Sequence, residues 1–130
     1  MSKAEMYYEF LEQEGYVPQY DGDGDIIFKK EGLTYIAFAS EDDAEFFRLA
    51  LPSFWSIKSE EEIVRVLAAA AAVNAEVKVV KVFPVGEWVW AAVELLIDPP
   101  ESFAAVFPRA MRLLRLGAER FVDTMRETAR

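Results

Sequence analysis

The chain has 130 residues, and its 14 Lys and Arg against 23 Asp and Glu give a net charge of −9. A chain of this length fits one domain, expected to span residues 1–130, and its acidity disfavours binding to nucleic acid or to an anionic membrane. Neither Cys nor His occurs, which excludes a disulfide, a thiol nucleophile, a Ser-His-Asp triad and the common zinc sites within one chain.

Two further features of the sequence set the expected location of the protein. The first ten residues, MSKAEMYYEF, lack the apolar segment of a signal peptide. No apolar run approaches the length of about 18 residues that a membrane-spanning helix needs. We therefore expect a cytoplasmic protein.

The N-terminal region is predicted to form a helix followed by four short strands. Ser2 and Glu5 match the S-x-x-E capping box, in which each side chain bonds the backbone of the other residue. This pattern predicts a helix from about Lys3 to Glu14, ended by a left-handed Gly15. Short turns rich in Gly, Asp and Glu then separate four apolar runs, which predicts an antiparallel meander. The predicted strands are Tyr16–Tyr20, Asp25–Lys30, Leu33–Ala39 and Ala44–Leu51.

A second helix is predicted after the meander. Pro52 closes the fourth apolar run, and residues 53–57 (SFWSI) are expected to form a connection. Another S-x-x-E pattern begins at Ser59, which predicts a helix from about Glu60 to Val73 with Asn74 as its left-handed terminator. The alanine-rich second half of this helix permits close approach to a sheet or to another helix.

The stretch Glu76–Ile97 has the strongest β-forming character of the chain. Two runs rich in Val and Trp flank residues 84–87, which predicts a hairpin whose strands are central in the sheet. The residues 98–100 (DPP) end the second strand, and apolar residues at spacings of three and four then predict a long helix to Arg130. Pro108 is expected to kink this helix or to divide off its first turn.

The predicted elements follow the order α-β-β-β-β-α-β-β-α. This order predicts an α+β fold, in which an antiparallel sheet of five to six strands packs against helices. No internal repeat or low-complexity linker interrupts the chain. A domain of this size and composition can build its core without a metal or a disulfide, and no cofactor is expected.

Two charged motifs are interpreted as structural. The run Asp21–Asp25 (DGDGD) resembles the start of a calcium loop, but Ile26 and Gly32 stand where an EF-hand loop needs Gly and Glu. A hairpin turn is the preferred interpretation, and weak incidental cation binding is the alternative. Four arginines of the last predicted helix are interpreted as a solvated helix face, because the first three fall within one sector. They are Arg109, Arg112, Arg115 and Arg120.

Glu94 is the one residue that we consider for acid–base catalysis. It lies in a predicted strand on the same face as Trp88 and Trp90, and catalysis of this kind needs a carboxylate with a perturbed pKa, usually a buried one. The preferred interpretation is a carboxylate at the wet edge of that face, paired with Lys78 or Arg48. No catalytic residue, metal ligand or phosphate-binding glycine motif is predicted, and we expect that the protein is not an enzyme.

The candidate binding residues are large aromatic side chains. They are Phe54, Trp55, Trp88 and Trp90. Trp is over-represented among the residues that dominate protein interfaces, and strand alternation puts Trp88 and Trp90 on one face of the sheet. If the helices cover only the other face, these two residues lie in an exposed apolar surface suited to a dimer or a partner. For each Trp, however, the preferred interpretation is an ordinary residue of the core, and a place in a binding surface is the alternative.

The order of elements and four sequence segments together resemble the YbjN family. The segments are FLEQEGY, GLTYIAFASEDDAEFFRLALP, VNAEVKVVKVF and ERFVDTMRE, and the resemblance extends from about residue 4 to residue 127. The family consists of small bacterial domains described as sensory transduction regulators, similar in fold to type III secretion chaperones. The resemblance implies an α+β fold, often dimeric, that acts by binding another protein. It assigns no role to any single residue.

The expected function is a non-enzymatic interaction module, chaperone-like or regulatory, that forms a homodimer and binds an unidentified protein partner. One alternative is a small-ligand sensor with an aromatic-lined pocket between the sheet and the last helix, formed by Trp88, Trp90 and Phe107. A third hypothesis is an enzyme that uses Glu94 with other carboxylates. A closed apolar pocket would favour the sensor, whereas a continuous exposed apolar patch would favour the interaction module.

Overall fold

The computed structural model describes residues 1–129, which form three α-helices, one short 3-10 helix and six strands. The predicted order of elements and the α+β fold class are confirmed. No helix within residues 1–129 is long and apolar enough to cross a membrane. The helices are α1 (Lys3–Gln13), α2 (Glu60–Glu76) and α3 (Phe103–Thr128), and η1 (Pro100–Ser102) leads into α3. The strands are β1 (Gln19–Tyr20), β2 (Ile26–Lys30), β3 (Leu33–Phe38), β4 (Phe46–Ser56), β5 (Val80–Val85) and β6 (Trp88–Leu96).

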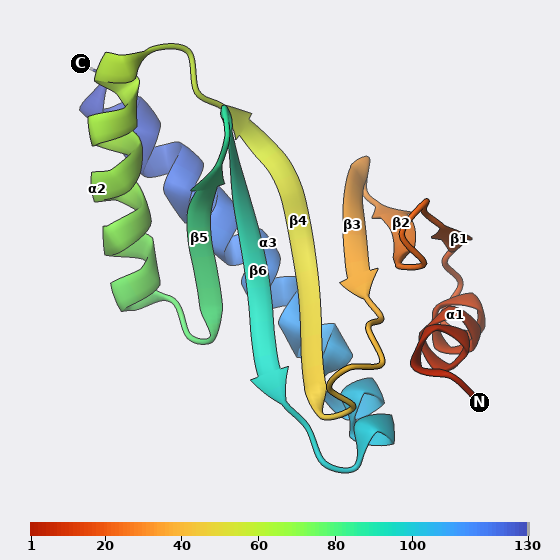
Figure 1. The fold of residues 1–130 in the computed structure, drawn as a ribbon. Coiled ribbons are helices and arrows are strands. Elements are labelled where there is room, and N and C mark those ends of the chain that lie inside the picture. The colour runs from red at the N-terminus through yellow and green to blue at the C-terminus, as the bar shows by residue number, and fades with distance from the viewer. Residues whose placement is uncertain (130) are drawn as a thin grey trace.

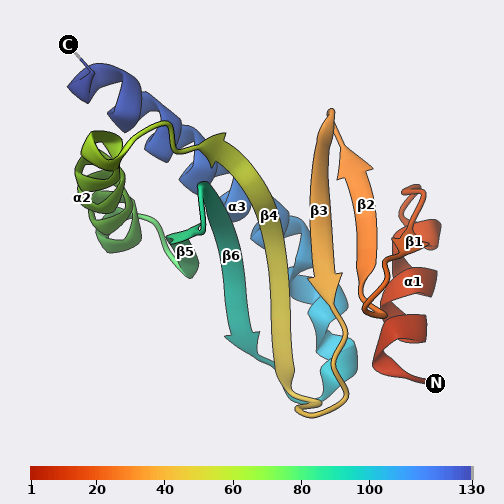
Figure 2. The ribbon, with the colours of Figure 1, turned by 45° about the horizontal axis from the view of Figure 1, so that its top comes forward.

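The strands form one antiparallel sheet in the order β1-β2-β3-β4-β6-β5. The two longest strands, β4 and β6, pair near its centre (Figure 1). Helix α3 crosses behind the sheet, and α2 lies beside α3 and β5 (Figures 1 and 2). None of the described helices crosses the front of β3, β4 or β6 in either view. The helices therefore cover one face of the sheet and leave the other open.

The core lies between the sheet and α3. The apolar residues that the sequence placed on one stripe of this helix are all buried, namely Phe107, Ala110, Leu114, Gly117 and Phe121. Gly117 allows α3 to approach β5 closely, because a Cβ at this position would lie 2.8 Å from Cγ1 of Val80. At the other end of the sheet, the ring of Tyr7 from α1 meets the rings of Phe47 and Phe103 edge to face.

The capping box at the start of α1 is confirmed. The Ser2 hydroxyl accepts from the Glu5 N–H at 3.1 Å, and the Glu5 carboxylate accepts from the Ser2 N–H at 3.0 Å. Gly15 follows the helix with φ of 92°, as predicted. Local sequence therefore determines both ends of this helix.

Lys3 attaches α1 to the loop between β3 and β4. Its ammonium donates to the carbonyl oxygens of Ser40 at 3.4 Å, Asp43 at 3.0 Å and Phe46, and its backbone N–H donates to the Glu41 carboxylate at 2.7 Å. Burial lowers the pKa of the Lys3 ammonium, whereas the charges of Asp43 and Glu41 act to raise it. Lys3 is only 8% exposed, so these carbonyl oxygens take the place of its hydration shell.

The first predicted strand is shorter than expected. Only Gln19–Tyr20 pairs with β2. Tyr16 instead packs its ring against Phe28, with the ring centres 5.1 Å apart. Pro18 precedes the short strand, in agreement with an edge strand that starts late.

Strand β4 is longer than predicted, and the expectation of a connection at residues 53–57 is wrong for most of that segment. The strand continues past Pro52 to Ser56 and pairs again with β6 after an irregularity between Leu51 and Trp55. Ser53 has a positive φ of 52° at this point. A bulge tolerates a proline because the ladder hydrogen bond is already interrupted there.

The second S-x-x-E pattern makes half of a capping box. The Ser59 hydroxyl accepts from the Glu62 N–H at 3.2 Å, which starts α2 as predicted. The Glu62 carboxylate does not return to Ser59 and instead accepts from Nε1 of Trp55 at 2.8 Å. This side chain therefore joins the start of α2 to the end of β4.

Asn74 does not terminate α2, and this prediction is wrong. The helix continues to Glu76, and the Asn74 side chain donates to the Val82 carbonyl at 3.1 Å and accepts from the Val82 N–H at 2.7 Å. The amide thus satisfies both backbone groups of one residue in the edge strand β5. A tertiary contact explains this Asn, rather than a left-handed backbone.

Helix α3 is continuous through Pro108, so the predicted division of this helix is wrong. Pro108 is the sixth residue of the helix, and its side chain is exposed. A proline near the N-terminus of a helix removes one intrahelical hydrogen bond, and the remaining turns are held by the packing of the apolar face.

Two buried tyrosines lead us to expect a loss of stability in alkaline solution. Burial raises the pKa of Tyr7, which the charge of Glu41 raises further, and burial also raises the pKa of Tyr35. The folded protein therefore retains protons that the unfolded chain releases above about pH 10. This contribution to stability is complete below that pH and is lost as the pH rises further.

The measurement is an alkaline titration that follows tyrosinate absorbance and far-ultraviolet circular dichroism together. A shared transition is expected, and it should move to higher pH in Tyr7→Phe, which has no phenol to ionise. Smooth ionisation of both buried tyrosines with the dichroism unchanged would contradict the expectation.

Candidate functional site

The candidate site is the sheet surface that the helices leave uncovered, here called the open face. Side chains alternate along β6, so Val89 and Val93 are buried in the core while Trp88 and Trp90 point to the other side. Trp88 is 45% exposed, and Trp90 is half-buried. Both tryptophans are therefore on the open face.

The strand register extends this apolar surface across the sheet. Ile27 of β2 pairs with Ile36 of β3, Ile36 pairs with Ala50 of β4, and Ala50 pairs with Ala92 of β6. The two alanines are fully buried although no helix covers them. Longer neighbouring side chains therefore cover them. The main apolar side chains of the open face are Ile27, Ile36, Phe38, Phe83, Trp88 and Trp90.

A charged cluster interrupts this apolar surface. Glu94 lies opposite Arg48 in the register, with 3.3 Å between its Oε2 and the arginine Nε, and it also pairs with Lys81 of β5. The Arg48 guanidinium lies 4.5 Å from the centre of the Phe38 ring, within cation–π range. The pairing predicted for Glu94 is correct for Arg48, and Lys81 takes the place proposed for Lys78.

This cluster has the properties of an orienting group. Glu94 lies between two cations, whereas the enzyme hypothesis required a second carboxylate beside it. Fixed charges of both signs within an apolar surface favour one orientation of a partner over others.

The four predicted binding residues divide into two pairs. Trp88 and Trp90 lie on the open face, but Phe54 and Trp55 lie on the opposite side of the sheet. Their rings meet that of Phe121 edge to face, at 5.5 Å and 5.8 Å between ring centres. Trp55 pairs with Val89 and therefore shares the core face of Leu51, while the irregularity in β4 brings Phe54 to this side as well. Both belong to the packing between sheet and helix.

The aromatic pocket of the sensor hypothesis does not form. Phe107 faces the core from α3 and packs against Phe10 and Phe28, whereas Trp88 and Trp90 are on the other side of the sheet. The open face also contains Ile36, Phe38 and Phe83, which were not among the predicted binding residues. Their segments, LTYIAF and VKVF, are apolar on both faces of the strand, and only the parity with Thr34 and with Lys81 could have assigned these residues to the side away from the core.

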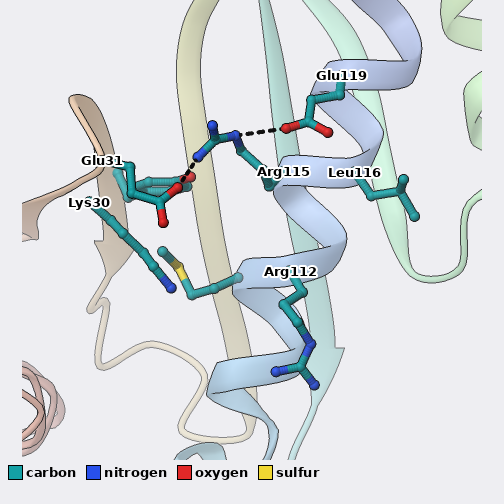
Figure 3. Close-up of a pocket in the computed structure, with 8 residues that line it drawn as sticks. Lys30, Glu31, Arg112, Arg115, Leu116 and Glu119 are labelled. Atoms are coloured by element: carbon teal, nitrogen blue, oxygen red, sulfur yellow. Dashed lines mark hydrogen bonds and ion pairs between the residues drawn. The ribbon is translucent and has the colours of Figure 1, made fainter.

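A hollow of about 230 Å³ between the β2–β3 turn and α3 contains part of the predicted arginine face (Figure 3). Arg115 donates to Glu31 at 2.7 Å and to Glu119 at 3.0 Å, and Figure 3 shows its guanidinium between these two carboxylates. Arg120 likewise pairs with Glu76 at 3.2 Å. These two arginines are neutralised by neighbouring carboxylates, as expected for a solvated helix face.

Comparison with known proteins gives a match in structure. No family model matches the sequence, and no curated protein matches it. The crystal structure of YbjN from E. coli, described as a proposed transcription regulator, superposes with a TM-score of 0.67 over 88% of this chain and 87% of that chain. The sequence identity is 12%. The chain therefore has a fold similar to that of YbjN.

Proposed function

We propose that this protein is a non-enzymatic protein-binding module, chaperone-like or regulatory, and that it forms a homodimer through the open face. The observation that carries the proposal is an apolar surface, built from five strands, that no described helix covers. Monomeric proteins rarely expose apolar patches larger than roughly a few hundred Å², and larger patches mark sites of association. The fold shared with YbjN, itself described as a regulator, agrees with a binding role.

The open face has the features of a sheet that packs on a second sheet. Two such faces can lie about 10 Å apart, as in a β-sandwich. Exposed side chains such as Trp88 can interdigitate between the two faces. In a twofold dimer, Glu94 of one copy can approach Arg48 or Lys81 of the other, which would fix the orientation of the two sheets.

Solution mass measured by light scattering across a dilution series tests the proposal. Ile36→Glu places a charge in the centre of the open face, and Trp88→Ala removes an exposed aromatic ring. Each is expected to raise the dimer dissociation constant by at least about tenfold. Leu67→Ala is the matched control, because Leu67 is 51% exposed on α2 and lies away from the open face. A wild-type protein that stays monomeric at every concentration would overturn the homodimer.

A further inference from the structure

The sheet has a free strand end beside an apolar groove. β5 pairs with β6 from Val80 opposite Val93 to Val85 opposite Trp88. β6 continues to Leu96, so residues 94–96 have no strand beside them on this side, and Figure 1 shows β6 extending past the start of β5. This length of β6, Glu94–Leu96, is here called the free end.

The backbone of the free end has unused hydrogen-bonding groups. Asn74 bonds both backbone groups of Val82, so Val82 points its N–H and C=O away from β6. Because these directions alternate along an antiparallel pair, Lys81 bonds Ala92, and the even-numbered residues of β6 face β5. Glu94 and Leu96 therefore direct their N–H and C=O groups to the free side. No turn or loop residue within 1–129 bonds them through its backbone.

The rest of this sheet edge is closed. The Val80 N–H donates to the Lys78 carbonyl at 2.8 Å, and Val82 is occupied by Asn74. Pro84 has no N–H to offer. An added strand therefore has hydrogen-bonding partners at the free end and not along β5.

A groove of about 320 Å³ runs beside the free end, on the side of the sheet that faces α3. Its walls are aliphatic: Val93 and Leu95 of β6, Val106, Ala110 and Leu113 of α3, and Val79. Lys78 and Arg109 also line it, and both are exposed. Neither has an ion-pair partner among residues 1–129, although the protein as a whole is acidic. The groove therefore suits an apolar group attached to a negative charge.

We propose that this groove binds the C-terminal end of a partner polypeptide whose last residue is aliphatic. A strand added antiparallel to β6 runs in the same direction as β5 and lies upstream of Val80. Its C-terminal carboxylate then reaches Lys78, two residues before β5 begins. A strand added in the opposite direction would bring an amino terminus to the same ammonium, and the like charges would repel. Charge complementarity thus selects both the direction and the chain end.

The register defines which side chain enters the groove. A residue opposite Leu95 shares its face of the sheet and points into the groove, and the preceding residue lies opposite Leu96 on the open face. The pair at Leu96 exchanges backbone hydrogen bonds, and the terminal carboxylate follows the residue opposite Leu95, on the side of Lys78. Leu96 is 79% exposed, so the added strand would also cover an apolar side chain.

This inference goes beyond the proposed function, and its groove lies on the side of the sheet that faces α3, opposite the proposed dimer surface. The inference names a class of partner for the proposed binding module. Peptide binding in the groove does not require the dimer and would occur equally in a monomer. Light scattering and peptide binding therefore fail independently of each other.

The test is fluorescence anisotropy with the whole protein and a library of labelled hexapeptides of the form Gly-Ser-Thr-x-Thr-x, made with a free terminal carboxylate and, in parallel, as amides. We expect binding by the free acids that end in Val, Leu or Ile, and affinity at least about tenfold weaker for the matching amides. Failure of every free acid to bind below about 1 mM, or equal binding of acids and amides, would overturn the proposal.

Two variants separate charge from strand pairing. Lys78→Glu is expected to weaken binding at least about tenfold, while Lys58→Glu, an equal charge change at an exposed lysine remote from the groove, should not. Leu96→Pro removes an N–H that no other strand uses and should also weaken binding, whereas Leu96→Ala keeps this N–H and should bind better than Leu96→Pro.

Two other occupants are distinguishable outcomes. If no peptide binds, but decanoate binds the wild type and Leu96→Pro with the same affinity, the groove is a site for a fatty carboxylate. Dissociation of a dimer by Lys78→Glu, again without peptide binding, would assign it to a second copy of the chain. Either result would overturn the peptide site.

Discussion

Phe121→Ala is expected to lower the free energy of unfolding by about 3–5 kcal/mol. Phe121 is 0% exposed on α3, and its ring makes edge-to-face contacts with Phe54 and Trp55. Truncation removes the transfer free energy of the ring and leaves a cavity where β4, α2 and α3 meet. The surrounding side chains can collapse into it only in part, because they are held by the sheet and by the hydrogen bond from Trp55 to Glu62.

Urea denaturation followed by tryptophan fluorescence measures this change, with the slope against urea checked for two-state behaviour. Leu116→Ala is the control on the same helix, because its side chain is exposed, and a change within about 0.5 kcal/mol is expected. An effect of Phe121→Ala as small as that of the control would mean that this region is not packed as described.

The second large effect is expected at Lys3, where Lys3→Met should lower the free energy of unfolding by about 2–3 kcal/mol. Methionine can fill much of the space of the lysine stem but donates no hydrogen bond. The carbonyl oxygens of Ser40, Asp43 and Phe46 would then lose a charged donor. The cost is that of leaving partly buried acceptors without a partner.

The same variant should loosen the β3–β4 loop. Amide hydrogen exchange is expected to speed up in residues 40–46, together with the first turn of α1, while β6 remains protected. Lys58→Met is the matched control, because Lys58 is exposed. Unchanged exchange and stability in Lys3→Met would show that the ammonium contributes nothing beyond its stem.

The sequence predicted those parts of the fold that depend on local chemistry. The capping box of Ser2 and Glu5 located the start of α1. Apolar residues at spacings of three and four identified α3, although not its continuity through Pro108. The hairpin of β5 and β6 followed from its Val and Trp content, but β5 lies at the edge of the sheet and not at its centre as predicted. In these cases the residue pattern and the tertiary structure favour the same conformation.

The errors arose where a distant segment decides the local conformation. Asn is a residue type that often terminates helices, but here the Asn74 side chain makes two hydrogen bonds to β5 while its backbone stays helical. Proline often ends a strand, but after Pro52 a bulge at Ser53 allows β4 to pair with β6 again. Neither partner lies within the sequence window from which the prediction was made.

The candidate site could be predicted in part. Strand alternation placed Trp88 and Trp90 on one face of the sheet. The same alternation occurs whether helices cover that face or leave it open, so it cannot show that the two residues are exposed. Only the common placement of α1, α2 and α3 decides between core and surface. Trp55 follows the alternation of Phe47, Leu49 and Leu51, but the strand was predicted to end at Leu51, so this pattern was not extended to it.

Asn74 also affects how copies of this protein can accumulate. Exposed edge strands are the usual starting points for the lateral addition of chains that leads to amyloid-like fibrils. Along β5 the Val82 backbone is already bonded, and the proline at position 84 offers no donor. The free end of β6 is only three residues long, which is too short to template a continuous sheet. One asparagine in a helix thus allows an apolar sheet to remain exposed with little risk of fibril growth at this edge.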